Sequence, residues 1–283
     1  MLSSAAVSAA AAAAGWPEPI CDTHSHVYPE NPAREASLAE YLAAARSIGV
    51  GRHVIVQSKA YRHDVGGTLE IVARLGLDRA RAILWDDPAW RRDERERLHA
   101  AGARGIRFLF APGSAVDVAA LAACAAQIAP LGWHLLVQAE GEALSATVLE
   151  ELAELDCPVV IDHIGRFAPA VTAGSPPFQA LVRFVGDGGW VKLAAPYYGT
   201  SDGAADFRPL RARIQALLEA GRSRIIWGMN WPHVNLPAER RPVEAAMLDS
   251  LLAVLQAEST ARLVLAGNAA RLYGFAAAPA AQG

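Results

Sequence analysis

Short apolar segments rich in β-branched residues recur along the chain and alternate with segments of helical periodicity. Short apolar runs predict buried strands, whereas apolar positions three and four residues apart predict amphipathic helices. The predicted strands are 19–27, 52–57, 80–85, 103–110, 133–139, 158–165, 190–194 and 224–230. The predicted helices are 37–49, 67–76, 94–102, 117–132, 149–155, 177–186 and 209–221.

Eight strands that alternate with helices predict an α/β fold, a single (β/α)8 TIM barrel. Several strands are apolar throughout, as expected when helices cover a parallel sheet. An open doubly wound sheet is the alternative, but no G-x-G-x-x-G segment follows a strand. We expect the barrel to span 17–276, between an alanine-rich flexible tail at 1–16 and a short tail at 277–283.

Composition and charge narrow the possible partners. The 283 residues are 53% hydrophobic and 19% charged, which is sufficient for a large core. Lysine and arginine total 26 against 29 acidic residues, and a net charge of −3 excludes the footprint of a general nucleic-acid-binding protein. The first fifteen residues lack a basic segment and are too weakly apolar to span a bilayer, so we expect neither a secretory signal nor a membrane partner. The sequence leaves the oligomeric state open.

The cysteines indicate the compartment. Cys21, Cys124 and Cys157 form no C-x-x-C pair, and three scattered cysteines indicate neither a zinc cage nor a disulfide scaffold. A protein of this kind is typical of a reducing environment, so we expect a cytoplasmic location.

Polar residues gather where the predicted strands end. In a (β/α)8 barrel, reactive groups lie at the C-terminal ends of the strands, so these side chains are expected to converge on one pocket. They are Asp22, His24, His26, Gln57, Lys59, Arg107, Gln138, Asp162, His163, Asn230 and His233.

Histidines dominate this set. His24 and His26 lie two apart on one strand, so both imidazoles face the same side, as a chelating pair or a pair of proton-transfer groups requires. A third histidine, His163, and the W-P-H segment that ends at His233 favour a functional interpretation over buried structural histidines. Strand alternation predicts that Asp162 points away from His163 and serves as a structural anchor.

Arg107 lies within an apolar strand, where a buried guanidinium without an anion is costly. It therefore either pairs internally or binds a substrate carboxylate or carbonyl. Lys59 and Lys192 permit the same inference less strongly. Trp231, near the end of the last strand, fits either core packing or a pocket wall.

Several segments together resemble the metal-independent lactonase branch of the amidohydrolase superfamily. They run in order through residues 21–275 and cover nearly the whole predicted barrel. The matching segments are DTHSHV, VIVQ, RGIRF, GWHLLVQ, VVIDHIGR, VKLAAP, RIIWGMNWPH and NAARLYGF. The resemblance implies an enzyme that acts on a small lactone.

Departures from the branch's pattern separate its hydrolases from its isomerases. The hydrolases place an aspartate after strand eight as the base for water, but this chain has Asn230, whose amide cannot accept a proton at neutral pH. The pyrone lactonases carry arginines in two stretches that read FLFAPGSAVD and AAPYYGTSD here, without arginine. Gln138 also matches the isomerase pattern, whereas His24 departs from it.

The resemblance therefore implies isomerisation of a carboxylated sugar (aldaric acid) lactone by intramolecular acyl transfer. The alternative is a lactonase that uses water, with Asn230 as natural variation or a trapping substitution. A non-catalytic lactone-binding barrel is a minor alternative. The expected catalytic residues are His24, His26, His163, Asn230 and His233. The expected substrate-binding residues are Lys59, Tyr61, Arg107, Gln138 and Trp231.

A metal is not expected to be required. The superfamily's binuclear site needs a carboxylated lysine and a strand-five histidine, but Gln138 and Arg107 stand at two of the positions concerned. A single divalent ion at His24, His26 and His163 is the alternative, and it would lack the strand-eight carboxylate because amide oxygens bind soft divalent metals poorly. We expect no cofactor and a small-molecule lactone as the partner.

Overall fold

The computed structural model describes residues 16, 18–28 and 36–276. The predicted tail at 277–283 lies outside the described residues, as does the predicted tail at 1–16 except for Trp16.

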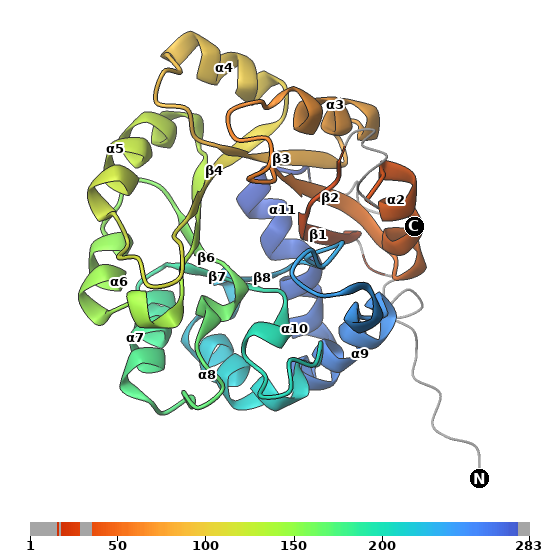
Figure 1. The fold of residues 1–283 in the computed structure, drawn as a ribbon, viewed down its shortest axis with the longest axis vertical. Coiled ribbons are helices and arrows are strands. Elements are labelled where there is room, and N and C mark those ends of the chain that lie inside the picture. Colours follow the sequence, from red (N-terminus) through yellow and green to blue (C-terminus); the bar gives the residue numbers. More distant parts are fainter. Residues whose placement is uncertain (1–15, 17, 29–35, 277–283) are drawn as a thin grey trace.

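Eight parallel strands follow one another around a barrel in the order of the sequence (Figure 1). They are β1 (Ile20–Ser25), β2 (Val50–Val56), β3 (Ala80–Trp85), β4 (Ala103–Leu109), β5 (His134–Gln138), β6 (Val159–Ile161), β7 (Trp190–Leu193) and β8 (Ile225–Trp227). A bridge between Ser25 and Trp231 joins the two ends of the sheet, and the His26 amide donates to the Trp231 carbonyl at 2.8 Å. The predicted (β/α)8 barrel is confirmed.

Helices surround the strands, with the predicted ones close to their expected positions (Figure 1). They are α2 (Leu38–Ser47), α3 (Gly66–Leu75), α4 (Arg92–Ala100), α5 (Val118–Ile128), α6 (Ala146–Ala153), α7 (Pro176–Gly186), α8 (Arg211–Gly221), α9 (Glu244–Leu255), α10 (Glu258–Arg262) and α11 (Asn268–Tyr273). Side chains cap several helices, as in the box that Ser37 and Glu40 form at the start of α2. No helix in the described part of the chain is both long and apolar enough to cross a membrane.

Helix α11 covers the N-terminal mouth of the barrel. Its residues share a core cluster with inward-facing strand residues such as Val54 and Leu136, and the Tyr273 ring lies 5.0 Å from the His134 ring. Arg81, at the start of β3, donates to the Tyr273 carbonyl at 3.1 Å and to the Gly274 carbonyl at 2.8 Å. With this mouth closed, a substrate can enter at the C-terminal ends of the strands.

Candidate active site

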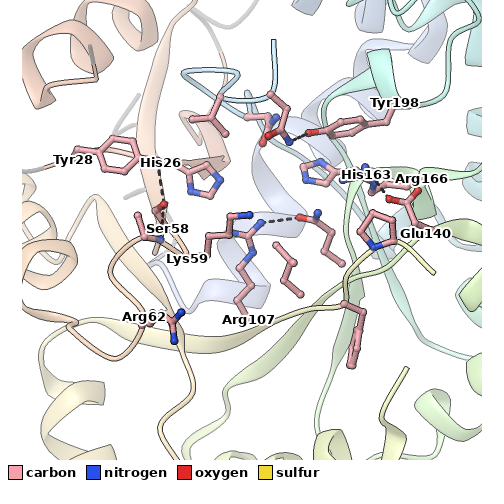
Figure 2. Close-up of a pocket in the computed structure, with 18 residues that line it drawn as sticks. His26, Tyr28, Ser58, Lys59, Arg62, Arg107, Glu140, His163, Arg166 and Tyr198 are labelled. Atoms are coloured by element: carbon pink, nitrogen blue, oxygen red, sulfur yellow. Dashed lines mark hydrogen bonds and ion pairs between the residues drawn. The ribbon is translucent and has the colours of Figure 1, made fainter. Parts of the chain in front are cut away.

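A cavity of about 830 Å³ opens at the C-terminal ends of the strands (Figure 2). Six of the predicted site residues line it: His26, Lys59, Arg107, Gln138, His163 and Asn230. The other lining residues are Tyr28, Ser58, Ala60, Arg62, Leu109, Phe110, Pro112, Glu140, Arg166, Tyr198, Val234 and Asn235.

Asp22 holds the H-x-H strand in place. Its fully buried carboxylate accepts hydrogen bonds from the His24 amide at 3.0 Å and from the Met229 amide, beyond β8, at 2.8 Å. The hydroxyl of Tyr41, on α2, donates to the same carboxylate at 2.9 Å. Asp22 thus ties β1 to the last strand and to the first helix, which sets the direction of both histidines.

His26 faces the cavity with a defined tautomer. Its Nδ1 lies 2.8 Å from the Val56 carbonyl, so we assign the proton to Nδ1 and a lone pair to Nε2. Burial lowers the pKa of His26 to about 3. His24 lies behind His26, outside the cavity lining, with the two Nε2 atoms 3.3 Å apart, and burial also lowers its pKa. Both imidazoles are therefore neutral at pH 7.

Asp162 contacts two histidines at once. Its Oδ1 lies 3.2 Å from His24 Nδ1, and its Oδ2 lies 3.3 Å from His163 Nε2. Strand alternation wrongly predicted that Asp162 and His163 point apart. Alternation applies only inside a strand, but β6 ends at Ile161, and positive φ angles at His163 (51°) and Ile164 (56°) turn the chain back.

The charges around Asp162 keep it ionised. Burial alone would raise the pKa of Asp162, but the neighbouring His163, His24 and Lys192 hold it well below its usual range. Burial lowers the pKa of His163 to about 4, an effect that the Asp162 charge opposes and that Arg107 reinforces. The His163 Nδ1 atom is buried and has no hydrogen-bond partner in the described part of the chain.

Two buried cations lie near this single carboxylate. Lys192 is fully buried on β7, with its Nζ donating to the Thr23 carbonyl at 2.8 Å and lying 3.4 Å from His24 Nδ1. Burial lowers the pKa of Lys192 to about 8. Arg107 is 6% exposed. It donates to Gln138 Oε1 at 2.8 Å, and it makes no ion pair within the described ranges.

Gln57 positions the loop that carries Lys59. Its Nε2 donates to the carbonyls of Arg62 at 2.9 Å and Asp64 at 2.8 Å, while its Oε1 accepts from the Trp85 amide at 2.7 Å. The buried glutamine therefore pins the segment after β2 to the end of β3. Figure 2 shows Lys59 reaching into the cavity beside Arg107.

The cavity attracts anions. Its charged lining residues are the cations Lys59, Arg62, Arg107 and Arg166, and one anion, Glu140. Arg166 and Glu140 neutralise one another through an ion pair of 2.9 Å (Figure 2). Three positive charges therefore remain for a ligand, which suits a carboxylate.

Four predicted site residues lie outside the cavity lining. His24 is behind His26, and His233 is 1% exposed, with its Nδ1 3.2 Å from the Tyr197 hydroxyl. The Trp231 ring packs 5.5 Å from the Tyr41 ring, and the Tyr61 ring lies 5.7 Å from that of Tyr28.

Sequence reasoning missed several lining residues that lie in loops, where no periodicity indicates direction. Arg62, Glu140 and Tyr198 are examples, because each lies two or more residues beyond the end of a strand. Arg166 could have been found, since it ends the VVIDHIGR segment that carries part of the family resemblance.

One group of side chains could hold a metal ion. His24, Asp162 and His163 each offer a ligand atom, and these atoms lie within 4.8 Å of one another. The set differs from the alternative considered from the sequence, since Asp162 takes the place of His26.

The C-terminal mouth of the barrel gathers an H-x-H pair, a third histidine and a buried aspartate. This is the arrangement of a (β/α)8-barrel enzyme with a histidine-rich active site. Within this class, the sequence matches the amidohydrolase family over residues 21–275, and the chain belongs to that family. The resemblance to the amidohydrolase superfamily inferred from the motifs is thus confirmed.

Named relatives include one isomerase and two hydrolases, which confirms the expectation of an enzyme. D-galactarolactone isomerase of Agrobacterium fabrum is 28% identical and the alignment covers 91% of this chain and 92% of the relative. 4-Sulfomuconolactone hydrolase of Hydrogenophaga intermedia is 29% identical, with 89% and 88% covered. 2-Pyrone-4,6-dicarboxylate hydrolase of Comamonas testosteroni is 28% identical, with 91% and 90% covered.

Solved structures share the fold. The apo crystal structure of an Agrobacterium tumefaciens protein, 27% identical, superposes with a TM-score of 0.80 over 92% of this chain and 97% of that one. An amidohydrolase from Burkholderia multivorans with bound zinc, 19% identical, superposes with a TM-score of 0.67 over 90% and 99%.

Proposed function

We propose that the protein isomerises a small carboxylated sugar lactone by moving the acyl group from one hydroxyl of the substrate to another. The observation that carries this proposal is the lack of a free carboxylate base among the described lining residues. Glu140 is bound to Arg166, while the groups near the reacting centre are neutral imidazoles and the Asn230 amide. Relatives that isomerise or hydrolyse lactones support a lactone as the substrate.

His163 is the proposed base. Its imidazole lines the cavity, and its Nε2 lies 3.3 Å from Asp162 Oδ2 in an ion-pair contact without hydrogen-bond geometry. The Asp162 charge favours the protonated form of His163 and so stabilises the imidazolium that forms when His163 takes a proton. The substrate hydroxyl gives its proton to the neutral His163 imidazole as its oxygen attacks the lactone carbonyl.

The intermediate then collapses toward the isomer. The original acyl–oxygen bond breaks, and the leaving alkoxide takes the proton back from the imidazolium, so no atom is gained or lost and no water is consumed. Lys59 and Arg107 supply positive charge for the substrate carboxylate and the developing oxyanion. His26 and Gln138 complete the polar wall, and His24 supports His26 from behind. Trp231 and Tyr61 act through the packing of the surrounding loops.

We further propose that the reaction needs no metal. A divalent ion at His24, Asp162 and His163 would meet a single carboxylate, with the Lys192 ammonium 3.4 Å from His24 Nδ1 and the Arg107 charge acting on His163. Two buried cations already balance that carboxylate, so the donor set fits a further double charge poorly.

We also propose that the enzyme works in the cytoplasm on a small molecule. All three cysteines are buried and free, which suits a reducing compartment.

A pH-stat combined with NMR tests the proposed reaction. The purified protein is incubated with a panel of aldaric acid lactones. Isomerisation converts one lactone into another and releases no acid, and this is the expected result. Release of one acid per turnover would replace the proposal with a lactonase that uses a histidine to activate water. Neither signal, with retained lactone binding, would indicate a binding protein.

A further inference from the structure

A chain of four polar side chains leads from the cavity to helix α9. The Asn230 Nδ2 donates to the Tyr197 hydroxyl at 2.6 Å, and that hydroxyl lies 3.2 Å from His233 Nδ1. On the far side of the imidazole, His233 Nε2 lies 3.4 Å from Glu244 Oε1, an ion-pair contact without hydrogen-bond geometry. Asn230 lines the cavity, whereas Tyr197 and His233 are buried behind it and Glu244 begins α9.

The donors and acceptors along these four side chains can be assigned in order, starting from Glu244. The Glu244 carboxylate beside Nε2 favours the tautomer with its proton on that atom, so we assign the proton to Nε2 and leave Nδ1 as the acceptor. The Tyr197 hydroxyl, whose pKa is raised by burial, keeps its single proton and donates it to His233. The Tyr197 oxygen must then accept from Asn230, and only the Nδ2 end of that amide can donate.

The oxygen end of the Asn230 amide is therefore left for the cavity. Its Oδ1 accepts no hydrogen bond from the described residues. Asn230 has a positive φ of 61°, and its amide nitrogen donates to the His24 carbonyl at 2.7 Å, so the backbone is also held. The result is a hydrogen-bond acceptor beside neutral histidines, which suits the O–H of a substrate.

We propose that Glu244, His233 and Tyr197 are positioning residues that hold the Asn230 oxygen toward the cavity, where it accepts a hydrogen bond from a substrate hydroxyl next to the attacking one. The inference rests on the proposed isomerisation and extends it. Asn230 orients the substrate through this neighbouring hydroxyl while His163 removes the proton of the attacking hydroxyl, and a lactone that lacks the neighbouring hydroxyl loses a specific contact.

Kinetics of three variants test the positioning role of Tyr197 and Glu244. Tyr197→Phe and Glu244→Ala should each lower kcat about 10- to 100-fold, because the amide loses its orientation. KM should rise no more than about tenfold, the value of the lost hydrogen bond, because Lys59 and Arg107 still bind the carboxylate. Glu244→Gln keeps an acceptor oxygen and should restore most of kcat. A matched control is Glu258→Ala. Glu258 is the first residue of α10, and the substitution removes its carboxylate and its ion pair with Arg262, so kcat should not change.

Ligand discrimination supplies a readout that a purely structural role would not move. The wild type should bind a lactone with the hydroxyl about tenfold more tightly than its deoxy analogue, the value of one hydrogen bond. Tyr197→Phe should abolish this preference. An unchanged preference, or an unchanged kcat in both Tyr197→Phe and Glu244→Ala, would overturn the proposal.

The direction of the chain can be measured without substrate. NMR of the ¹⁵N-histidine-labelled protein, with His233→Gln identifying the signal, should show His233 protonated on Nε2 alone. Protonation on Nδ1 would overturn the proposal even if the enzyme isomerises lactones. Conversely, a proton on His233 Nε2 in a protein that isomerises no lactone would refute the proposed function. The order of donors and acceptors from Glu244 to Asn230 would still be established.

Discussion

Two buried arginines should respond to the same substitution in opposite ways. Arg107, in the cavity wall, makes hydrogen bonds to Gln138 and the Gln57 carbonyl but no ion pair within the described ranges. Arg95, on α4 and 2% exposed, lies 3.4 Å from Asp86 and donates to Gln127 at 2.8 Å. The Arg107 guanidinium is thus available to bind an anionic ligand, whereas the Arg95 guanidinium is already paired with Asp86.

Arg107→Met should weaken binding of a carboxylated lactone. A charge-assisted hydrogen bond contributes about 1.5–3 kcal/mol, which corresponds to a rise in KM of about 10- to 150-fold. An uncharged lactone should lose far less. The free energy of unfolding should stay the same or increase, because methionine removes a buried charge that burial already disfavours, as the lowered pKa of Arg107 indicates.

Arg95→Met is the matched control. It breaks a partly buried ion pair and leaves Asp86 without its cation, so it should lower the free energy of unfolding by about 1–3 kcal/mol. KM should not change, because Arg95 lies outside the cavity lining. For both variants, steady-state kinetics measure KM on a charged and an uncharged lactone, and urea denaturation measures the free energy of unfolding. Equal KM rises on both lactones, or a stability loss for Arg107→Met as large as that for Arg95→Met, would refute the anion-binding role.

Three further predictions concern the reacting groups. Asn230→Asp should gain acid-releasing hydrolysis and lose isomerisation, because it adds a base and raises the pKa of nearby histidines; a wild type that already hydrolyses lactones and is indifferent to the change would contradict this. Burial lowers the pKa of His26 to about 3 and of His163 to about 4, below the unfolded value of 6.5. The unfolded chain therefore binds these protons first, and urea denaturation should show stability falling from pH 7.5 to pH 5 by about 2 kcal/mol per histidine; constant stability would contradict the burial of neutral imidazoles. Dialysis against a chelator should leave activity intact, and stoichiometric zinc or manganese whose removal abolishes activity would show that a metal is required.

Strand positions could be predicted because a buried parallel strand is apolar along its whole length. The strand predicted at 133–139 is observed as His134–Gln138. The C-terminal helices were not predicted, since a sequence such as EAAMLDSLLAVL in α9 is apolar on most sides and shows little helical contrast. Helix α11 covers the barrel mouth through tertiary contacts, which a local pattern does not reveal.

The candidate site was predictable where a strand aims a side chain. Arg107 lies on β4 and His26 directly follows β1, and the rule that reactive groups stand at strand ends placed both at the cavity. The rule failed one residue beyond a strand, at Asp162, because left-handed backbone angles replaced alternation. The hydrogen-bonded chain behind Asn230 was not predictable, because it joins the segments after β7 and β8 to α9 only in the folded barrel.

Isotopic oxygen tests the central claim most directly. The enzyme is incubated with an aldaric acid lactone in H₂¹⁸O, and the products are followed by mass spectrometry and NMR. Because a substrate hydroxyl is the nucleophile, the isomeric lactone should form without ¹⁸O and before any ring-opened acid. Appearance of ring-opened acid with one ¹⁸O per turnover, and no ¹⁸O-free isomer, would show that water is the nucleophile and would contradict intramolecular acyl transfer.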